Sequence, residues 1–313
     1  MEHFVTLFDS GFLPQGLALY SSLEHQAEPF TLWVICMDLE AENALGRLSL
    51  QHLKVIPLQS VESLFPALLS VKLGRTRAEY CWTLTPFSYS AVMNADPSAK
   101  RITYVDADVA LFGPASNILQ EMDATNCDVL LTDHAYAPEY QQESTSGRYC
   151  VQFLPFRTNP RGIEILRWWQ DRCIEWCFAR FEDGKFGDQK YLDDWTTRWG
   201  SSARALTDVH LTLAPWNAAN LYNPEKKLGI YHFHNLRLYA GGKIRYWHWY
   251  YIPGIVKKRF YLAYKILLEN AVLRLKESGH FPSYPKYTQS LTDSLKTLKR
   301  KINRLDGWGR VKF

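Results

Sequence analysis

The sequence predicts an α/β fold with a mostly parallel, twisted sheet flanked by helices. Through the first 110 residues, short apolar runs alternate with longer amphipathic segments. Such alternation is typical of parallel strands joined by right-handed helical crossovers. The chain has 313 residues, of which 47% are hydrophobic, so it can bury one large core or two modest ones. Three aspartates directly follow expected strands, at the end of the sheet where open α/β folds bind ligands.

The expected elements follow one another regularly up to the third of these aspartates. Pro14 is well placed to open the first helix, and Pro86 lies early in the second. Asp9, Asp38 and Asp106 each come at the end of a strand, so we expect them to line one edge of the sheet. The predicted strands are residues 4–8, 31–37, 55–58 and 102–105, and the predicted helices are residues 15–25 and 80–93.

The second half of the chain is expected to continue this architecture less regularly. A helix over 160–180 carries Trp168, Trp169 and Trp176 at helical spacing, which favours a place in the core over a platform for sugars. Further segments are strands at 129–132, 151–155 and 230–235, a polar loop at 141–147, and a helix start at Asp188-Gln189, where backbone N–H groups suit an anion or a sugar hydroxyl.

The pair Asp106-Ala-Asp108 stands where the strand 102–105 should stop. Two carboxylates separated by one small residue can converge on one divalent cation once the chain bends. Ligands that are all oxygen favour Mg²⁺ or Mn²⁺ over Zn²⁺. The alternative is an acidic turn in solvent, since a bare Asp-x-Asp is a weak motif. His232 and His234 are expected on one face of the strand 230–235.

The net charge of +4 conceals a division of the chain into an acidic body and a basic tail. From Lys257 onward there are fourteen Lys and Arg against four acidic residues, so the preceding part is net acidic. We expect a catalytic domain over 1–252 and a helical, basic extension over 253–313. The extension contains two apolar stripes at helical spacing, at 260–275 and 291–305. It is either a cap on the body or an arm on an anionic membrane surface. The acidic body and the apolar stripes argue against a nucleic-acid partner.

Cysteine usage and the N-terminus predict a cytoplasmic protein with reduced thiols. The six cysteines lack the spacing of a disulfide framework, and Cys173 and Cys177, one helical turn apart, are expected to pack in the core. Met1 leads directly into the first strand, which does not fit a signal peptide. Apolar stretches stay well below the roughly 18 residues needed to span a bilayer.

Several segments, taken in order over residues 3–245, resemble the GT-A glycosyltransferases, specifically the branch related to family 8. The opening segment Phe4-Val-Thr-Leu-Phe-Asp-Ser-Gly resembles the family's first strand and nucleotide loop. The segments that support the resemblance further along the chain are Trp82-Thr-Leu-Thr-Pro86, Tyr104-Val-Asp-Ala-Asp108, Gly187-Asp-Gln-Lys-Tyr-Leu192, Ala214-Pro-Trp-Asn217 and His232-Phe-His-Asn235.

This resemblance implies a role for each matching residue. Asp106 and Asp108 would hold Mn²⁺, with Mg²⁺ as the alternative, and His234 is our first choice for the third ligand, with His232 second. Asp188 would bind hydroxyls of the donor sugar, and Gln189 would lie near the anomeric carbon. Residues implied at the nucleotide are Thr6, Phe8, Asp9, Tyr104 and Lys243.

The chain departs from the family pattern at the phosphate contacts. Relatives carry a basic residue in the helix before the metal motif, whereas residues 87–93 offer none. The usual spacing from the late histidine to a lysine is also absent, so Lys243 or Arg237 is expected to take over at the phosphates.

The resemblance implies a metal-dependent, retaining hexosyltransferase that uses a nucleotide sugar, with UDP-sugar as the expected donor. Its acceptor would be a cell-envelope glycan or a lipid-linked glycan, reached from the cytoplasm at the inner face of the membrane. The alternatives are a sugar nucleotidyltransferase and a non-catalytic nucleotide- or sugar-binding protein. The segment following the first strand, Asp9-Ser-Gly-Phe-Leu-Pro14, is a poor phosphate loop for a nucleotidyltransferase.

Overall fold

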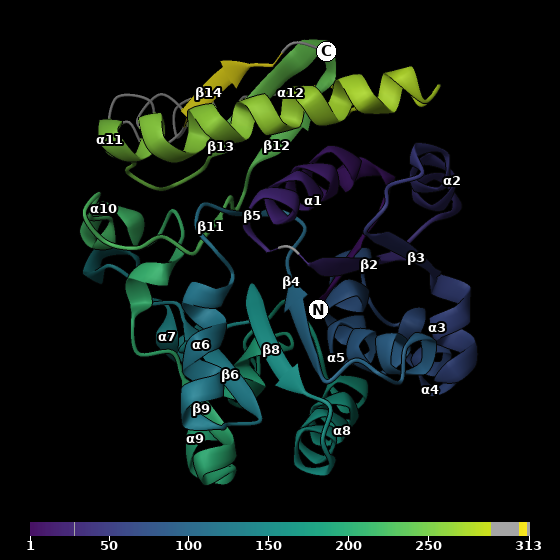
Figure 1. Ribbon diagram of the computed structural model, residues 1–313, viewed down its shortest axis with the longest axis vertical. Coiled ribbons are helices and arrows are strands. Elements are labelled where there is room, and N and C mark those ends of the chain that lie inside the picture. Colours follow the sequence, from purple (N-terminus) through teal and green to yellow (C-terminus); the bar gives the residue numbers. More distant parts are fainter. Residues whose placement is uncertain (28, 289–306, 312–313) are drawn as a thin grey trace.

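The computed structural model describes residues 1–27, 29–288 and 307–311. Within these residues, eight strands form one central sheet in the order β3-β2-β1-β4-β8-β6-β7, with β9 paired to β6 (Figure 1). The strands are β1 Glu2–Phe8, β2 Phe30–Cys36, β3 Leu53–Pro57, β4 Arg101–Val105, β6 Val129–Asp133, β7 Tyr149–Cys150, β8 Phe153–Arg157 and β9 Ala203–Ala205.

The sheet is mostly parallel, as the sequence predicts. β1 pairs in parallel with both β2 and β4, and β2 with β3. These strands therefore end at one edge, hereafter the carboxyl edge, and Asp9, Asp38 and Asp106 follow them there. β8 runs antiparallel to β4 and to β6. It starts at Phe153, two residues later than expected, because residues 151–152 form a turn.

Helices cover both faces of the sheet, and the alternation of side chains along β1 separates two cores. Val5 and Leu7 face a cluster with α5 and α8. Phe4 and Phe8 face the opposite cluster, with α1, α2 and α6. These helices span α1 Leu13–Gln26, α2 Leu39–Leu48, α5 Arg77–Ala95, α6 Ser116–Thr125 and α8 Pro160–Glu175, and the short helices α3 Leu58–Leu64 and α4 Ala67–Lys72 precede α5.

The helix predicted over 160–180 ends early, at Glu175. Trp176 takes an extended conformation, and the Arg75 guanidinium donates to the carbonyl oxygens of Ile174 and Cys177 at 2.8 and 3.1 Å. Because a side chain satisfies the carbonyl of Ile174 in the last turn and that of Cys177 just beyond it, the chain can leave the helix here without unpaired carbonyls at these two residues. Trp169, Trp176 and both cysteines of this segment are buried, and Trp168 is partly buried against the same core. The prediction that these side chains pack in the core is confirmed.

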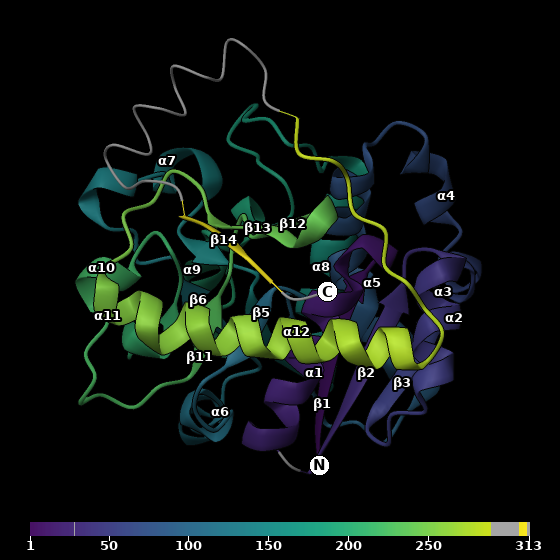
Figure 2. The ribbon, with the colours of Figure 1, turned by 90° about the horizontal axis from the view of Figure 1, so that it is seen from above.

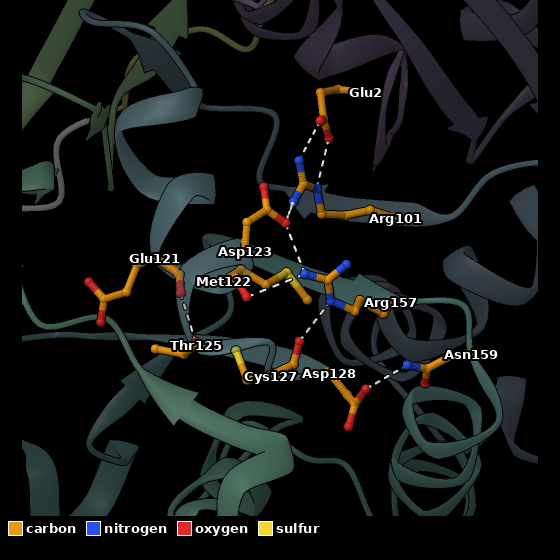
Figure 3. Close-up of polar contacts among 10 residues, drawn as sticks. All are labelled: Glu2, Arg101, Glu121, Met122, Asp123, Thr125, Cys127, Asp128, Arg157 and Asn159. Atoms are coloured by element: carbon orange, nitrogen blue, oxygen red, sulfur yellow. Dashed lines mark hydrogen bonds and ion pairs between the residues drawn. The ribbon is translucent and has the colours of Figure 1, made fainter.

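Figure 3 shows a chain of ion pairs and hydrogen bonds around the start of β4 and the end of β8. Arg101, at the start of β4, pairs with Glu2 and donates to Asp123 at 2.7 Å. Arg157, at the end of β8, donates to the same Asp123 carboxylate at 2.9 Å and to the Cys127 carbonyl at 3.0 Å. Three strands and the end of α6 are thus tied together away from the carboxyl edge.

The last part of the described chain packs onto this α/β body. β11 (Ile230–His232) lies between β10 (Thr212–Leu213) and β5 (Val109–Leu111), and a second small sheet joins β12 (Arg237–Tyr239), β13 (Lys243–Trp247) and β14 (Gly307–Arg310). After α11 (Gly254–Val256), helix α12 (Leu262–Glu277) runs across α1 (Figures 1 and 2). The remaining short helices at the edges of the fold are α7 Glu143–Ser146, α9 Trp195–Arg198 and α10 Ala218–Leu221.

Helix α12 belongs to the core. Tyr264 stacks on Phe233 with ring centroids 3.6 Å apart, and Ala271 and Leu275 join the cluster of α1. Packing is continuous across the predicted domain boundary at residue 252, which stays a prediction. The extension is also not wholly helical, since residues 307–310 form a strand on β13. The predicted leucine stripe at 291–305 lies outside the described residues. None of the helices that the structure describes is long and apolar enough to cross a bilayer.

Candidate active site

The turn between β4 and β5 presents the two aspartates of the Asp-x-Asp motif. Its backbone is fixed at both ends: the Asp106 N–H donates to the Gln152 carbonyl at 3.1 Å, and the Val109 N–H donates to the Asp106 carbonyl at 3.0 Å. Tyr104, at the end of β4, donates its hydroxyl hydrogen bond to Asp106 Oδ1 at 3.1 Å. The motif is therefore a built turn at the carboxyl edge, in contrast to a loose acidic loop.

His232 completes a cluster with these carboxylates. β11 pairs with β5 so that His232 lies opposite Val109, and the Phe233 N–H donates to the Asp108 carbonyl at 2.8 Å. His232 Nε2 lies 3.1 Å from Asp108 Oδ1 and 3.8 Å from Asp106 Oδ2. Nδ1 of the same ring lies 2.9 Å from Gln152 Oε1. An amide oxygen accepts only, so Nδ1 carries a proton, and Nε2 is the nitrogen that faces the carboxylates and would bind a metal ion after losing its own proton.

The donor set suits a divalent cation. One ligand atom from each of Asp106, Asp108 and His232 lies within 4.8 Å of the others, and their side chains are 31%, 14% and 7% exposed. Burial and the neighbouring Asp108 charge raise the pKa of Asp106. Burial alone would lower the pKa of His232, but Asp108 outweighs it and raises that pKa. Two carboxylates held close together repel each other when both are ionised, and a bound cation would neutralise their charge.

His234, our first choice as the third ligand, is not part of this cluster. Its ring centroid lies 5.6 Å from that of His232 and 5.5 Å from that of Trp216. Burial and the charge of His232 lower the pKa of His234 to about 3, so the imidazole stays neutral. The strand ends at His232 and Asn235 has a positive φ of 65°, so the alternation that would place both histidines on one face does not continue. The geometry favours His232.

Asp188 and Gln189 lie at the start of a short 3-10 helix, Gln189–Leu192. Asp188 is buried, and its carbonyl accepts a hydrogen bond from Trp169 Nε1 at 2.9 Å. Burial, helped by the charge of Asp106, raises the pKa of Asp188 to about 8. Asp188 is thus an electrostatic neighbour of the metal motif. The structure confirms a helix start at Asp188-Gln189, as a short 3-10 helix, and a site for an anion or a sugar hydroxyl there stays a prediction.

The residues implied at the nucleotide have very different exposures. Thr6 is fully buried, and Phe8 is 4% exposed and packs against Gly16. Asp9 is accessible at the carboxyl edge, where it accepts from the Gly11 N–H at 3.0 Å and pairs with Arg77 at 2.8 Å. Tyr104 is buried beside the metal motif. Contact of these four side chains with a nucleotide stays a prediction, and Asp9 is the one most open to a ligand.

The basic residues near the site were only partly foreseen. Arg77, in the first turn of α5, joins Asp9 to Asp38, with 2.8 Å to each carboxylate. Arg77 lies outside the predicted helix, because the capping box of Thr76 and Glu79 starts α5 three residues before the expected position. Lys243 lies over the rings of Tyr287 and Trp308, at 3.6 and 4.6 Å.

The positive charge of Arg237 reaches the cluster. Among the causes that lower the pKa of Asp108, after the dominant His232, is the positive charge of Arg237. The same charge helps to lower the pKa of His234. Its guanidinium lies 5.4 Å from the ring centroid of Phe12, beside the loop that follows β1. Of the two basic candidates for the phosphates, the geometry favours Arg237.

Comparison with known proteins places this site in a recognisable fold. No protein-family model matches the chain. The glycosyltransferase GlyE of Streptococcus pneumoniae TIGR4 superposes with a TM-score of 0.51 at 14% identity, over 92% of this chain and 67% of GlyE. The bifunctional glycosyltransferase WbbM gives 0.50 at 11% identity, over 90% of this chain and 52% of WbbM. The chain therefore has the GT-A fold of nucleotide-sugar transferases, as the sequence predicts.

Among curated proteins, the chain is similar to the uncharacterized protein YfnF of Bacillus subtilis strain 168. The two are 29% identical over 262 residues, which are 78% of this chain and 85% of YfnF. Membership of family 8 within the GT-A fold stays a prediction.

Proposed function

We propose that this protein is a metal-dependent, retaining glycosyltransferase that moves a sugar from a nucleotide sugar, with UDP-sugar as the donor, to a glycan or glycolipid acceptor. The observation that carries the proposal is the convergence of Asp106, Asp108 and His232 at the carboxyl edge of a sheet with the glycosyltransferase fold. In open α/β sheets this edge is where ligands bind.

In such a reaction the site must stabilise a nucleoside diphosphate as it leaves the sugar. Negative charge builds on the leaving group, and a divalent cation, Mn²⁺ as first choice and Mg²⁺ as second, would neutralise it. Asp106, Asp108 and His232 would hold that cation. The guanidinium of Arg237 would supply a second, fixed positive charge. Arg237 would thereby take the place of the basic residue that residues 87–93 lack.

Asp188 and Gln189 would bind the sugar end of the donor. The raised pKa of Asp188, about 8, leaves its carboxyl protonated at neutral pH before ligands bind, so it can both donate to and accept from a sugar hydroxyl. A cation bound beside it would favour the ionised form. Asp9 would receive the nucleoside at the other end, with the buried Thr6, Phe8 and Tyr104 supporting the pocket.

The test is Mn²⁺-dependent hydrolysis or transfer from a panel of nucleotide sugars. The substitution Asp108→Ala should reduce the rate by about 100-fold or more, while Asp171→Ala, on the exposed side of α8, should leave it unchanged. Full activity of Asp108→Ala would contradict the metal role. Release of pyrophosphate would point to a nucleotidyltransferase, and binding of nucleotide by calorimetry without turnover would point to a non-catalytic protein.

We further propose that the protein works in the cytoplasm, peripherally on the inner membrane face, on a cell-envelope acceptor. The support is an apolar stripe on α11 and α12 that remains more than half exposed and is flanked by Lys258, Arg259 and Arg274. Its members are Ile255, Leu262, Ile266 and Leu273. Removal of residues 257–313 would also remove the buried Tyr264 and Leu275, so Ile266→Glu is the cleaner variant.

Vesicle flotation tests this proposal. The wild-type protein should float with anionic phosphatidylglycerol vesicles more than with zwitterionic ones, and Ile266→Glu should reduce that binding. Substitution of another exposed residue, Phe181→Glu, is the matched control because Phe181 lies outside this stripe. Equal flotation of wild type and Ile266→Glu would refute the membrane role of α12.

A further inference from the structure

Residues 141–147 lie between β6 and β7 and against the short helix that begins at Gln189; the sequence predicted a polar loop here, but residues 143–146 form the short helix α7. Residues 141–145 are all exposed, so little apolar burial holds this segment. Its contacts with the body are polar ones to the Asp-Gln segment. Segments held in this way are readily opened, because few buried contacts oppose their release.

Lys190 and Asp193 bind the backbone within this segment and directly after it. Lys190 Nζ donates to the Glu143 carbonyl at 2.8 Å and lies 2.7 Å from Asp193 Oδ2. The other carboxylate oxygen of Asp193 accepts from the Arg148 N–H at 2.8 Å. The Lys190 side chain is only 14% exposed. A largely buried ammonium is costly unless it is paired, so these contacts define one preferred position of the loop.

The same segment contacts Gln189 directly. Gln189 Nε2 donates to the Ser146 carbonyl at 2.6 Å. A carbonyl can only accept, so this contact fixes which end of the carboxamide faces the loop. The amide nitrogen is turned toward Ser146, and the oxygen is the polar atom left for a ligand.

Gly147 permits this close approach. Its φ is +102°, a conformation that L side chains rarely adopt. A Cβ at this position would lie 3.1 Å from Asp193 Oδ1 and 3.4 Å from Lys190 Cα. The loop backbone therefore meets the Asp-Gln segment where only glycine is accommodated without strain.

We propose that residues 141–147 form a latch that positions Gln189, and that Lys190 and Asp193 hold the latch closed. Gln189 is the residue that acts on the donor sugar, so this inference rests on the proposed function. Lys190 and Asp193 are positioning residues that act through the loop. With the latch closed, the carboxamide oxygen is directed away from Ser146; with the latch open, the amide is free to rotate and its preorganisation is lost.

The first experiment tests the latch without requiring catalysis. Hydrogen–deuterium exchange of the peptide covering residues 142–149 should become about tenfold faster in Lys190→Met, because the loop opens more often. Glu143→Ala is the matched control, since the Glu143 contact with Lys190 uses a backbone carbonyl that alanine retains. Unchanged exchange in Lys190→Met would overturn the latch, whether or not the protein is a glycosyltransferase.

The second experiment tests positioning by a double-mutant cycle. Lys190→Met should lower kcat for transfer about tenfold, while the Kd for the donor with Mn²⁺ stays within about twofold. In the Gln189→Ala background the same substitution should change kcat by less than about twofold, because the residue that the latch orients is gone. An equal loss in both backgrounds would refute positioning of Gln189. A wild-type protein without turnover would refute the proposed function and leave the exchange result to decide the latch.

Discussion

His232 Nε2 lies 3.1 Å from Asp108 Oδ1, although the two residues come from distant parts of the sequence. The contact arises because β11 adds to β5 in an antiparallel register that places His232 opposite Val109. Gln152, on the turn before β8, accepts from the other ring nitrogen. Backbone pairing and one amide side chain thus fix the position of the imidazole and keep a proton on Nδ1.

This relationship predicts different effects for the two histidines. His232→Gln should weaken Mn²⁺ binding by about tenfold or more, because it removes a ligand from a preformed set of three. His234→Gln should change the affinity by less than about threefold. Isothermal titration with Mn²⁺ measures both. The reverse order of effects would show that His234, and not His232, is the metal ligand.

Arg237 and Lys243 can be separated in the same way at the donor phosphates. Arg237→Met should weaken binding of UDP in the presence of Mn²⁺ by about tenfold, because it removes a cation whose field reaches Asp108. Lys243→Met should have a smaller effect on UDP, since its ammonium packs over Tyr287 and Trp308. Calorimetric titration with UDP checks this order, and uridine, which lacks phosphates, should bind both variants equally. A stronger effect of Lys243→Met would indicate that the phosphates bind near β13 and not near Arg237.

The buried carboxyl of Asp188 predicts a pH-dependent stability in the absence of metal and donor. In the unfolded chain it ionises near its ordinary pKa of 3.8, whereas in the folded protein burial raises the pKa to about 8. The folded state therefore binds this proton more tightly, and its contribution is lost as pH rises from about 4 toward 8. Asp188→Asn should raise the free energy of unfolding at pH 8 and have little effect at pH 4.5.

Urea unfolding at the two pH values, with EDTA present, measures this difference. Each pKa unit is worth about 1.4 kcal/mol, so a gain of several kcal/mol at pH 8 is expected. The exposed Asp171→Asn should show no such pH dependence. An equal effect of Asp188→Asn at both pH values would mean that the carboxyl is not held protonated.

Two helical glycines predict opposite stability changes. A Cβ at Gly16 would lie 2.4 Å from the ring of Phe8, so Gly16→Ala should destabilise by about 1–3 kcal/mol through overpacking. A Cβ at Gly46, in α2, has no other atom within 4 Å, so Gly46→Ala should stabilise by about 0.5–1 kcal/mol. Chemical denaturation of both variants measures this, and stabilisation by Gly16→Ala would show that Phe8 moves freely.

Much of the sheet could be predicted because its strands carry their own signal. The apolar runs of β1, β2 and β4 are buried along nearly their whole length, so their composition alone distinguished them from loops. Helix ends were less predictable. α8 stops where Arg75, from another part of the chain, donates to the carbonyls of Ile174 in its last turn and of Cys177 beyond it, and a contact between distant residues leaves no local pattern.

The basic residues of the site illustrate the same limit. Lys243 and Arg237 are six residues apart and equally basic in sequence, yet one packs against Tyr287 and Trp308 while the other lies beside Phe12. Pairing of β12 with β13 places both residues on one face of the hairpin, so the difference comes from the distant segments that pack near each of them. Neither spacing nor composition contains the direction in which a hairpin residue points relative to a distant loop.

The sequence by itself determined the alternation of strands and helices, the aspartates at the strand ends and the order of the motifs, because each depends on neighbours along the chain. Only the tertiary structure decided which histidine joins Asp106 and Asp108, which of the two basic candidates has its charge near Asp108, and what contacts Gln189. These depend on strand register and on loops that meet across the fold. A shift of one residue in β11 would turn His232 to the other face of its strand, and no local pattern encodes that register.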